Sequence, residues 1–92
     1  MFIYKAMTAL TRDNSVSFPL PDNRLHCVLS IVREPQCAVL RAQVVSDTHA
    51  LEGDIHRAPD MDTMMAFLQD EGNEAQVSFA IRHLWDRMEG RQ

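Results

Sequence analysis

The chain has 92 residues, of which 46% are apolar and 24% are charged, and its formal net charge is −4. This length suits one domain with one hydrophobic core, residues 1–92, and the composition excludes a highly charged disordered chain. The first twenty residues include Lys5, Arg12 and Asp13 and no unbroken apolar run. We therefore expect neither a signal peptide nor a membrane span, and a cytoplasmic protein.

Two short segments at the start of the chain are predicted to be strands. Residues 2–10, FIYKAMTAL, are short and aromatic, and turn-forming residues follow at 12–15. Residues 15–20, SVSFPL, alternate polar with apolar side chains. Pro19 indicates an edge strand, because proline has no N–H to donate to a neighbouring strand.

The clearest pattern is a hairpin of residues 25–33 and 36–45 around Glu34-Pro35. A two-residue loop there places Arg33 opposite Gln36 and puts small and apolar side chains on one face, which we assign to the core. The other face is mixed and carries His26, Val28, Ser30, Val32, Cys37, Val39, Arg41 and Gln43. Cys27 and Cys37 then lie on opposite faces, which excludes a disulfide, and their spacing does not match a zinc site.

Residues 46–59 are predicted to be a loop, because Asp, Gly and Pro are frequent there. Two helices are expected after it. Asp60 is the N-cap of the first, Gly72 ends it, and its apolar stripe is Met61, Met64, Met65 and Leu68. Asn73 and Gln76 resemble a capping box for the second, whose stripe is Val77, Ala80, Ile81, Leu84, Trp85 and Met88. The predicted class is α+β, with an antiparallel sheet of about four strands from the N-terminal half packed against two C-terminal helices.

The nearest approach to a chemical motif is a repeated Asp-x-His, formed by Asp47 with His49 and by Asp54 with His56. Such side chains are ligands for zinc, manganese or iron, and a bound ion could activate water for hydrolysis. The repeat lies in the predicted loop, and its spacing matches neither a zinc-protease helix nor a calcium loop. A polar loop is the favoured interpretation, so we assign no catalytic residue, metal or cofactor and expect no enzymatic activity. A metal-dependent hydrolase stays open as an alternative.

Charge divides unevenly along the chain. Residues 1–46 contain five basic and three acidic side chains, a net charge of +2, whereas residues 47–92 contain four basic and ten acidic ones, a net charge of −6. Arg24, Arg33 and Arg41 could bind phosphates locally. Because these arginines are scattered and lack an aromatic ladder or a recognition helix, we expect no independent DNA binding.

Two features of the C-terminal half could form binding surfaces. Asp70, Glu71 and Glu74 belong to an acidic cluster that is either a solvated helix face or an imitation of nucleic-acid phosphates. On the last helix, Phe79 and His83 lie opposite the apolar stripe. Phe79 is therefore either covered by residues 46–59 or exposed as an anchor for a partner.

Taken whole, the chain resembles the small phage-encoded anti-CRISPR proteins that inhibit type I-F surveillance complexes. The resemblance covers all 92 residues and rests on size, on strands followed by helices, on acidity and on the absence of an enzyme motif. It implies a non-enzymatic inhibitor in the host cytoplasm that binds Cas subunits around a guide RNA and stops target DNA from pairing.

On this hypothesis the outer sheet face and the acidic helices bind the partner, and arginines reach guide-RNA phosphates. The candidate residues are Arg24, His26, Arg33, Arg41, Gln43, Asp70, Glu71, Glu74, Phe79 and His83. A small phage regulator or toxin–antitoxin partner, which would form a homodimer, is a further alternative.

Overall fold

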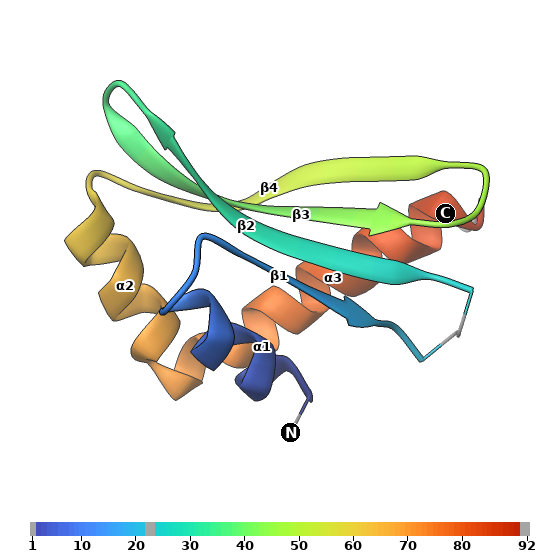
Figure 1. The fold of residues 1–92 in the computed structure, drawn as a ribbon, viewed down its shortest axis with the longest axis horizontal. Helices are drawn as coiled ribbons and strands as arrows, with labels where there is room; N and C mark the ends of the chain where they lie inside the picture. The colour runs from blue at the N-terminus through green and yellow to red at the C-terminus, as the bar shows by residue number, and fades with distance from the viewer. Residues whose placement is uncertain (1, 22–23, 91–92) are drawn as a thin grey trace.

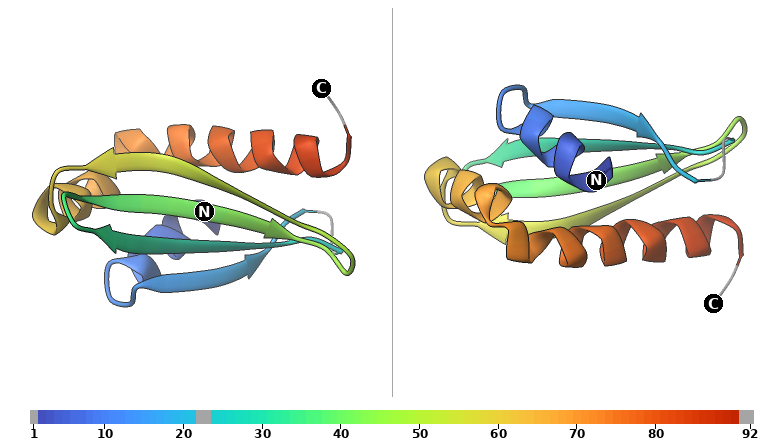
Figure 2. Two further views of the ribbon diagram at one scale, coloured as in Figure 1. Left: turned by 90° about the horizontal axis from the view of Figure 1, so that it is seen from above. Right: turned by 90° about the horizontal axis from the view of Figure 1, so that it is seen from below.

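The computed structural model describes residues 2–21 and 24–90. A helix α1 (Phe2–Leu10) precedes four strands, β1 (Ser15–Pro19), β2 (His26–Glu34), β3 (Cys37–Val45) and β4 (Ala50–Ala58). Helix α2 (Met61–Gln69), a 3-10 turn η1 (Glu71–Asn73) and helix α3 (Glu74–Met88) follow. The strands form one antiparallel sheet in chain order, and all three α-helices lie against the same face of it (Figures 1 and 2). The α+β class is confirmed.

The β2–β3 hairpin has the predicted faces but a different register. Glu34 pairs with Cys37, so the two-residue loop is Pro35-Gln36, one residue later than predicted. Ile31 therefore lies opposite Leu40 rather than Ala38, a shift of two residues in the partner. Because side chains alternate with a period of two, this shift leaves every side chain on its expected face. Cys27 is accordingly in the core, Cys37 is on the other face, and both thiols are free.

The predicted strand at residues 2–10 is wrong, because this segment is helix α1. Its buried side chains are Ile3, Ala6, Met7 and Leu10, which recur at i, i+3, i+4 and i+7. This spacing places all four on one helix face, and that face closes the core against β1 and β2. The helical period of the apolar residues outweighs the aromatic content that suggested a strand.

The predicted loop at 46–59 is also wrong over most of its length, because Ala50–Ala58 form β4. This strand pairs with β3 from Ala50 opposite Val45 to Ala58 opposite Ala38, with a bulge that leaves Ile55 unpaired. Polar residues are acceptable here because β4 is an edge strand with one uncovered face. The sheet thus has the expected four strands, but β4 takes the place assigned to residues 2–10.

Gly53, which suggested a loop, instead permits close packing of α3 on β4. A Cβ atom at position 53 would lie 3.1 Å from Cδ2 of Leu84. A side chain at this position would require the end of the Leu84 side chain to move by a few tenths of an ångström.

Both predicted C-terminal helices are present and bury the expected stripes. Met64, Leu68, Val77, Ile81 and Leu84 are buried, and the other stripe residues are half-buried. Asp60 is the N-cap of α2, as expected, since Thr63 N donates a hydrogen bond to its Oδ1 at 2.7 Å.

The predicted end of α2 at Gly72 is wrong, whereas the predicted start of α3 after Asn73 is confirmed, although without the capping box. Helix α2 ends at Gln69, before Gly72, because the backbone of Asp70 is extended, with ψ 109°, and Gly72 N then donates to Oδ1 of Asp70 in the next turn. Asn73 makes no capping box; its Nδ2 donates to the Phe67 carbonyl oxygen and ties the turn to α2.

Within the described ranges, no helix is both long enough and apolar enough to cross a membrane.

Candidate binding surface on the open sheet face

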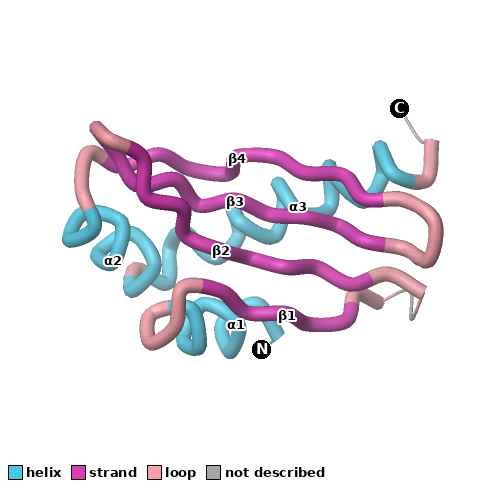
Figure 3. Tube along the Cα trace, turned by 45° about the horizontal axis from the view of Figure 1, so that its top comes forward, coloured by secondary structure: helices cyan, strands magenta, loops and turns pink. Residues whose placement is uncertain are grey.

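The sheet face turned away from the helices has no covering element among the described residues. Seen from above, this face lies in front of α1, α2 and α3, and an oblique view shows the strands side by side with the helices behind (Figures 2 and 3). Arg41 on β3 stands between Ser30 on β2 and Asp54 on β4. Gln43, two residues on, stands between Val28 and Glu52. Arg41 and Gln43 therefore form a polar pair on this face of β3, between Val39 and Val45.

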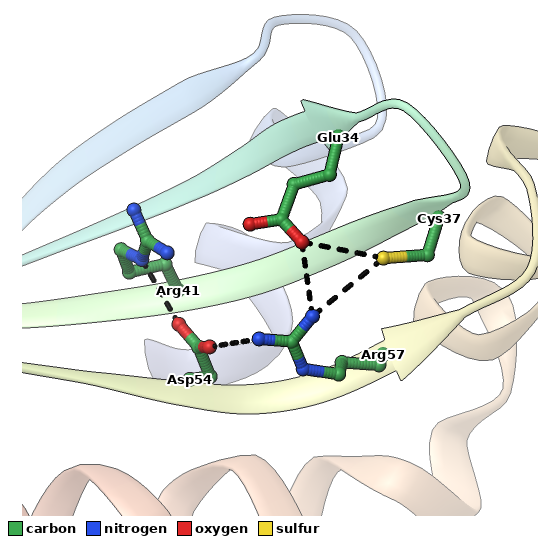
Figure 4. A network of polar contacts seen from close by, with 5 residues as sticks. All are labelled: Glu34, Cys37, Arg41, Asp54 and Arg57. Atoms are coloured by element: carbon green, nitrogen blue, oxygen red, sulfur yellow. Dashed lines mark hydrogen bonds and ion pairs between the residues drawn. The ribbon is translucent and has the colours of Figure 1, made fainter.

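Five side chains of this face form a connected polar network (Figure 4). Asp54 accepts hydrogen bonds from Nε of Arg41 at 2.9 Å and from an Nη of Arg57 at 2.7 Å. The other Nη of Arg57 donates to Oε1 of Glu34 at 3.0 Å and contacts Sγ of Cys37 at 3.6 Å. The Cys37 thiol donates to the same Glu34 oxygen at 3.5 Å. The network joins β2, β3 and β4 across the sheet.

Arg41 and Arg57 use different numbers of guanidinium nitrogens in the network. Arg57 uses both Nη atoms inside the network, whereas Arg41 uses Nε alone (Figure 4), and no described residue forms a hydrogen bond or ion pair with the Arg41 Nη atoms. The Arg41 side chain is 29% exposed. Its two Nη groups are therefore available to an incoming anion. The hydrogen bond from Nε to Asp54 fixes the orientation of the side chain.

Hydrogen bonding fixes the charges in this network. The hydrogen bond from Arg41 lowers the pKa of Asp54 below its ordinary value of 3.8, and the charges of both arginines act in the same direction. The hydrogen bond to Asp54 raises the pKa of Arg41, and the bond to Glu34 raises that of Arg57. Asp54, Arg41 and Arg57 are therefore ionised at neutral pH.

The other predicted basic and polar residues divide between this face and its surroundings. His26 and Gln43 share the open face with Arg41, as expected, and His26 is exposed near the end where β2 begins. Arg24 precedes β2 and lines a depression with Asp47 and Thr48 at that end of the sheet. Arg33 lies on the opposite face from Arg41, because it pairs with the core residue Ala38.

The acidic candidates lie on the helical side of the molecule. Asp70, Glu71 and Glu74 surround a cleft of about 220 Å³ between α1 and the α2–α3 junction, with Tyr4 and Thr8 on its other wall. Oε1 of Glu74 is buried there without a hydrogen-bond partner in the described chain. The structure does not bring this cluster together with Arg41, so the two belong to separate surfaces.

Phe79 is 75% exposed on α3. It cannot be covered by a loop at 46–59 because most of that segment is built into the sheet as β4. His83, one turn along α3, is also exposed. Phe79 lies between two surface clefts, one shared with Ile55 and His83 and the other with Trp85 and Leu20.

The side chains of the repeated Asp-x-His do not meet at one site. Asp54 belongs to the open-face network, whereas His56, beyond the bulge, stacks on Phe67 of α2 with ring centroids 3.8 Å apart. Nδ1 of His49 lies 2.8 Å from Oγ1 of Thr48 in the β3–β4 turn. In residues 2–21 and 24–90, no three His, Cys, Asp or Glu side chains are grouped so as to hold a metal ion.

The network contains four residues that the sequence patterns did not single out as binding residues, Glu34, Cys37, Asp54 and Arg57. Two of them belong to β4, whose strand character was missed. The alternation of Glu52 and Asp54 with Leu51, Gly53 and Ile55 is the signal that could have identified them.

Comparisons of the chain with protein-family models, with curated proteins and with solved structures found no match.

Proposed function

We propose that the protein is a non-enzymatic inhibitor that binds a CRISPR surveillance complex through its open sheet face and blocks target DNA binding. The observation that carries the proposal is Arg41, whose Nη atoms are bound by no described residue and which Asp54 holds on a sheet face that no described element covers. Cas subunits and the phosphates of their guide RNA are the proposed partners.

Arg41 suits this role for physical reasons. Its two free Nη groups can bind a phosphate or carboxylate in a bidentate manner, and the bond from Nε to Asp54 restricts the side chain before a partner arrives. Pre-ordering reduces the entropy lost on binding. Ser30 lies opposite Arg41 on β2 and Gln43 lies two residues along β3, so two further polar side chains, both half-buried, are next to Arg41 on this face.

The acidic cluster of Asp70, Glu71 and Glu74 is the second proposed contact. It lies on the other side of the molecule from Arg41, so it would bind a different part of the complex. A strand-separating channel for DNA is rich in lysine and arginine, and an acidic patch complements such a surface.

The test is a mobility-shift assay of a purified type I-F surveillance complex with labelled target DNA. Wild-type protein should abolish the shifted band, and Arg41→Glu should restore it because the new carboxylate repels phosphate. Arg12→Glu is the matched control, since Arg12 is exposed in the turn after α1 and away from the sheet face. Full DNA binding in the presence of wild-type protein, with no co-migration of the two, would overturn the proposal.

A further inference from the structure

Helix α3 carries a continuous exposed stripe opposite its core stripe. Ala75, Phe79, Arg82 and Asp86 recur at i, i+4, i+7 and i+11 and so lie along one line of the helix, called here the α3 ridge. Ala75, Phe79 and Arg82 are exposed and Asp86 is half-buried. Phe79 is 75% exposed within this stripe, and a projecting aromatic side chain can serve as the anchor of an interface.

An apolar cleft lies directly beside the ridge. It has a volume of about 440 Å³ and is lined by Ile3, Leu20, Pro21, Ile81 and Trp85, together with Ala75, Phe79 and Arg82 of the ridge itself. A cavity of about 150 Å³ accommodates benzene, so this cleft has room for a phenylalanine ring. A projecting aromatic side chain and an apolar cleft that can receive it therefore lie side by side on one element.

We propose that two copies of the chain pair through antiparallel α3 ridges, with Phe79 of each copy in the cleft of the other. The two-fold axis passes between positions 79 and 82. Each Phe79 then faces Arg82 of the second copy, and each Ala75 faces Asp86 of the second copy. This surface is separate from the open sheet face, and the pairing leaves both sheet faces turned outward.

The charges of the ridge favour this orientation. Arg82 makes no ion pair with any described residue, so its guanidinium is available to lie against the Phe79 ring as a cation–π contact. Each Asp86 meets an alanine instead of another charge. Parallel ridges would oppose Arg82 to Arg82 and Asp86 to Asp86, which is unfavourable.

The antiparallel orientation also separates the acidic clusters of the two copies. Glu74, the member of each cluster closest to the two-fold axis, lies about six residues from it along α3, so the two clusters are about 20 Å apart at 1.5 Å per residue. This separation exceeds the Debye length of about 8 Å at physiological ionic strength, so their repulsion is screened. The acidic end of each copy instead adjoins the end of α3 that carries Arg87 in the other.

Sedimentation velocity over increasing protein concentration tests the pairing. Wild-type protein should show a reversible monomer–dimer equilibrium, and Phe79→Asp should raise its dissociation constant at least about tenfold. Tyr4→Asp is the matched control, because Tyr4 is, with Phe79, an exposed large aromatic residue among those whose burial the structure describes, at 48%, and lies outside the cleft. Arg82→Glu should weaken the dimer as well, and circular dichroism checks the fold of each variant. A monomer at every concentration, or a dimer that neither variant at 79 nor 82 weakens, would overturn the proposal.

Ala75→Lys tests the orientation. In antiparallel ridges the new lysine faces Asp86 of the second copy, so the dissociation constant should fall. Parallel ridges would place the two lysines against each other, and a weaker dimer would therefore contradict the antiparallel arrangement.

Discussion

Arg41 donates a hydrogen bond from Nε to Oδ1 of Asp54 at 2.9 Å, at the point where the register between β3 and β4 shifts. The bulge leaves Ile55 unpaired, so Asp54 lies on the open face beside Arg41 while His56 turns toward α2. The bulge in β4 therefore allows the polar network to form. It also places Asp54 and His56, the two residues of the second Asp-x-His, on opposite faces of the sheet.

Replacing Asp54 tests whether the orientation of Arg41 matters for binding. Asp54→Asn removes the negative charge that holds both arginines, so the affinity for a surveillance complex should fall although Arg41 itself is intact. The urea midpoint should change little, because ion pairs at partly exposed sites contribute little to folding. Affinity measured by biolayer interferometry and unfolding followed by circular dichroism separate the two effects. Unchanged affinity would show that Asp54 does not prepare Arg41 for a partner.

The Arg41–Asp54 pair predicts that the free energy of unfolding depends on pH. The folded-state pKa of Asp54 is lower than the unfolded value, so its stabilising contribution is present above about 3.8 and is lost as the pH falls below that value. The small difference in stability between wild type and Asp54→Asn should therefore disappear on acidification. Thermal unfolding of both proteins from neutral pH to about pH 2 measures it. A difference that grows in acid would contradict the ionised state of Asp54.

Cys27 should be inert and should affect stability only in alkali. Burial raises the pKa of its thiol from 9.0 to about 12. The stability contributed by the neutral thiol is therefore complete below pH 9.0 and is lost as the pH rises toward about 12. Cys27→Ala should show a weaker decline over this range than wild type, measured by urea unfolding. An equal decline in the two proteins would show that the thiol does not control it.

The reactivity of the two cysteines tests which face of the sheet each of them occupies. Iodoacetamide should alkylate Cys37 in the folded protein and reach Cys27 only after unfolding, because Cys37 is half-buried on the open face and Cys27 is in the core. Peptide mass spectrometry locates the modification. Rapid alkylation of Cys27 under native conditions would contradict the assignment of the core face.

Substitution of Gly53 probes the contact between β4 and α3. Gly53→Val should destabilise the fold by about 1–3 kcal/mol, because the added atoms meet the Leu84 side chain. Gly53→Ala should cost less, since the end of Leu84 can move by a few tenths of an ångström. Ala50→Val on the same strand is the control, because Ala50 is exposed. Chemical denaturation measures all three, and equal effects at 50 and 53 would show that α3 does not approach β4 closely.

Local periodicity was sufficient to predict the elements whose pattern has only one interpretation. The stripes at 61–68 and 77–88 recur with a helical period, and residues 25–45 alternate over two long segments joined by a tight turn. The assignment of β2 and β3 side chains to faces survived a register error, because a shift of two residues preserves the alternation. Arg41, His26 and Gln43 were therefore placed on the correct surface from the residues alone.

The tertiary structure decided α1 and β4, because each segment has a pattern that two structures can satisfy. Residues 2–10 combine aromatic side chains with an apolar stripe, and the stripe became helical because it closes the core beside β1. Residues 50–58 contain Asp and Gly, which indicate a loop, yet an edge strand with one open face accepts polar side chains, and Gly53 admits Leu84. The network around Arg41 depends on this strand. Its members are distant in the sequence, from Glu34 to Arg57, and only the pairing of β2, β3 and β4 brings them within hydrogen-bonding distance.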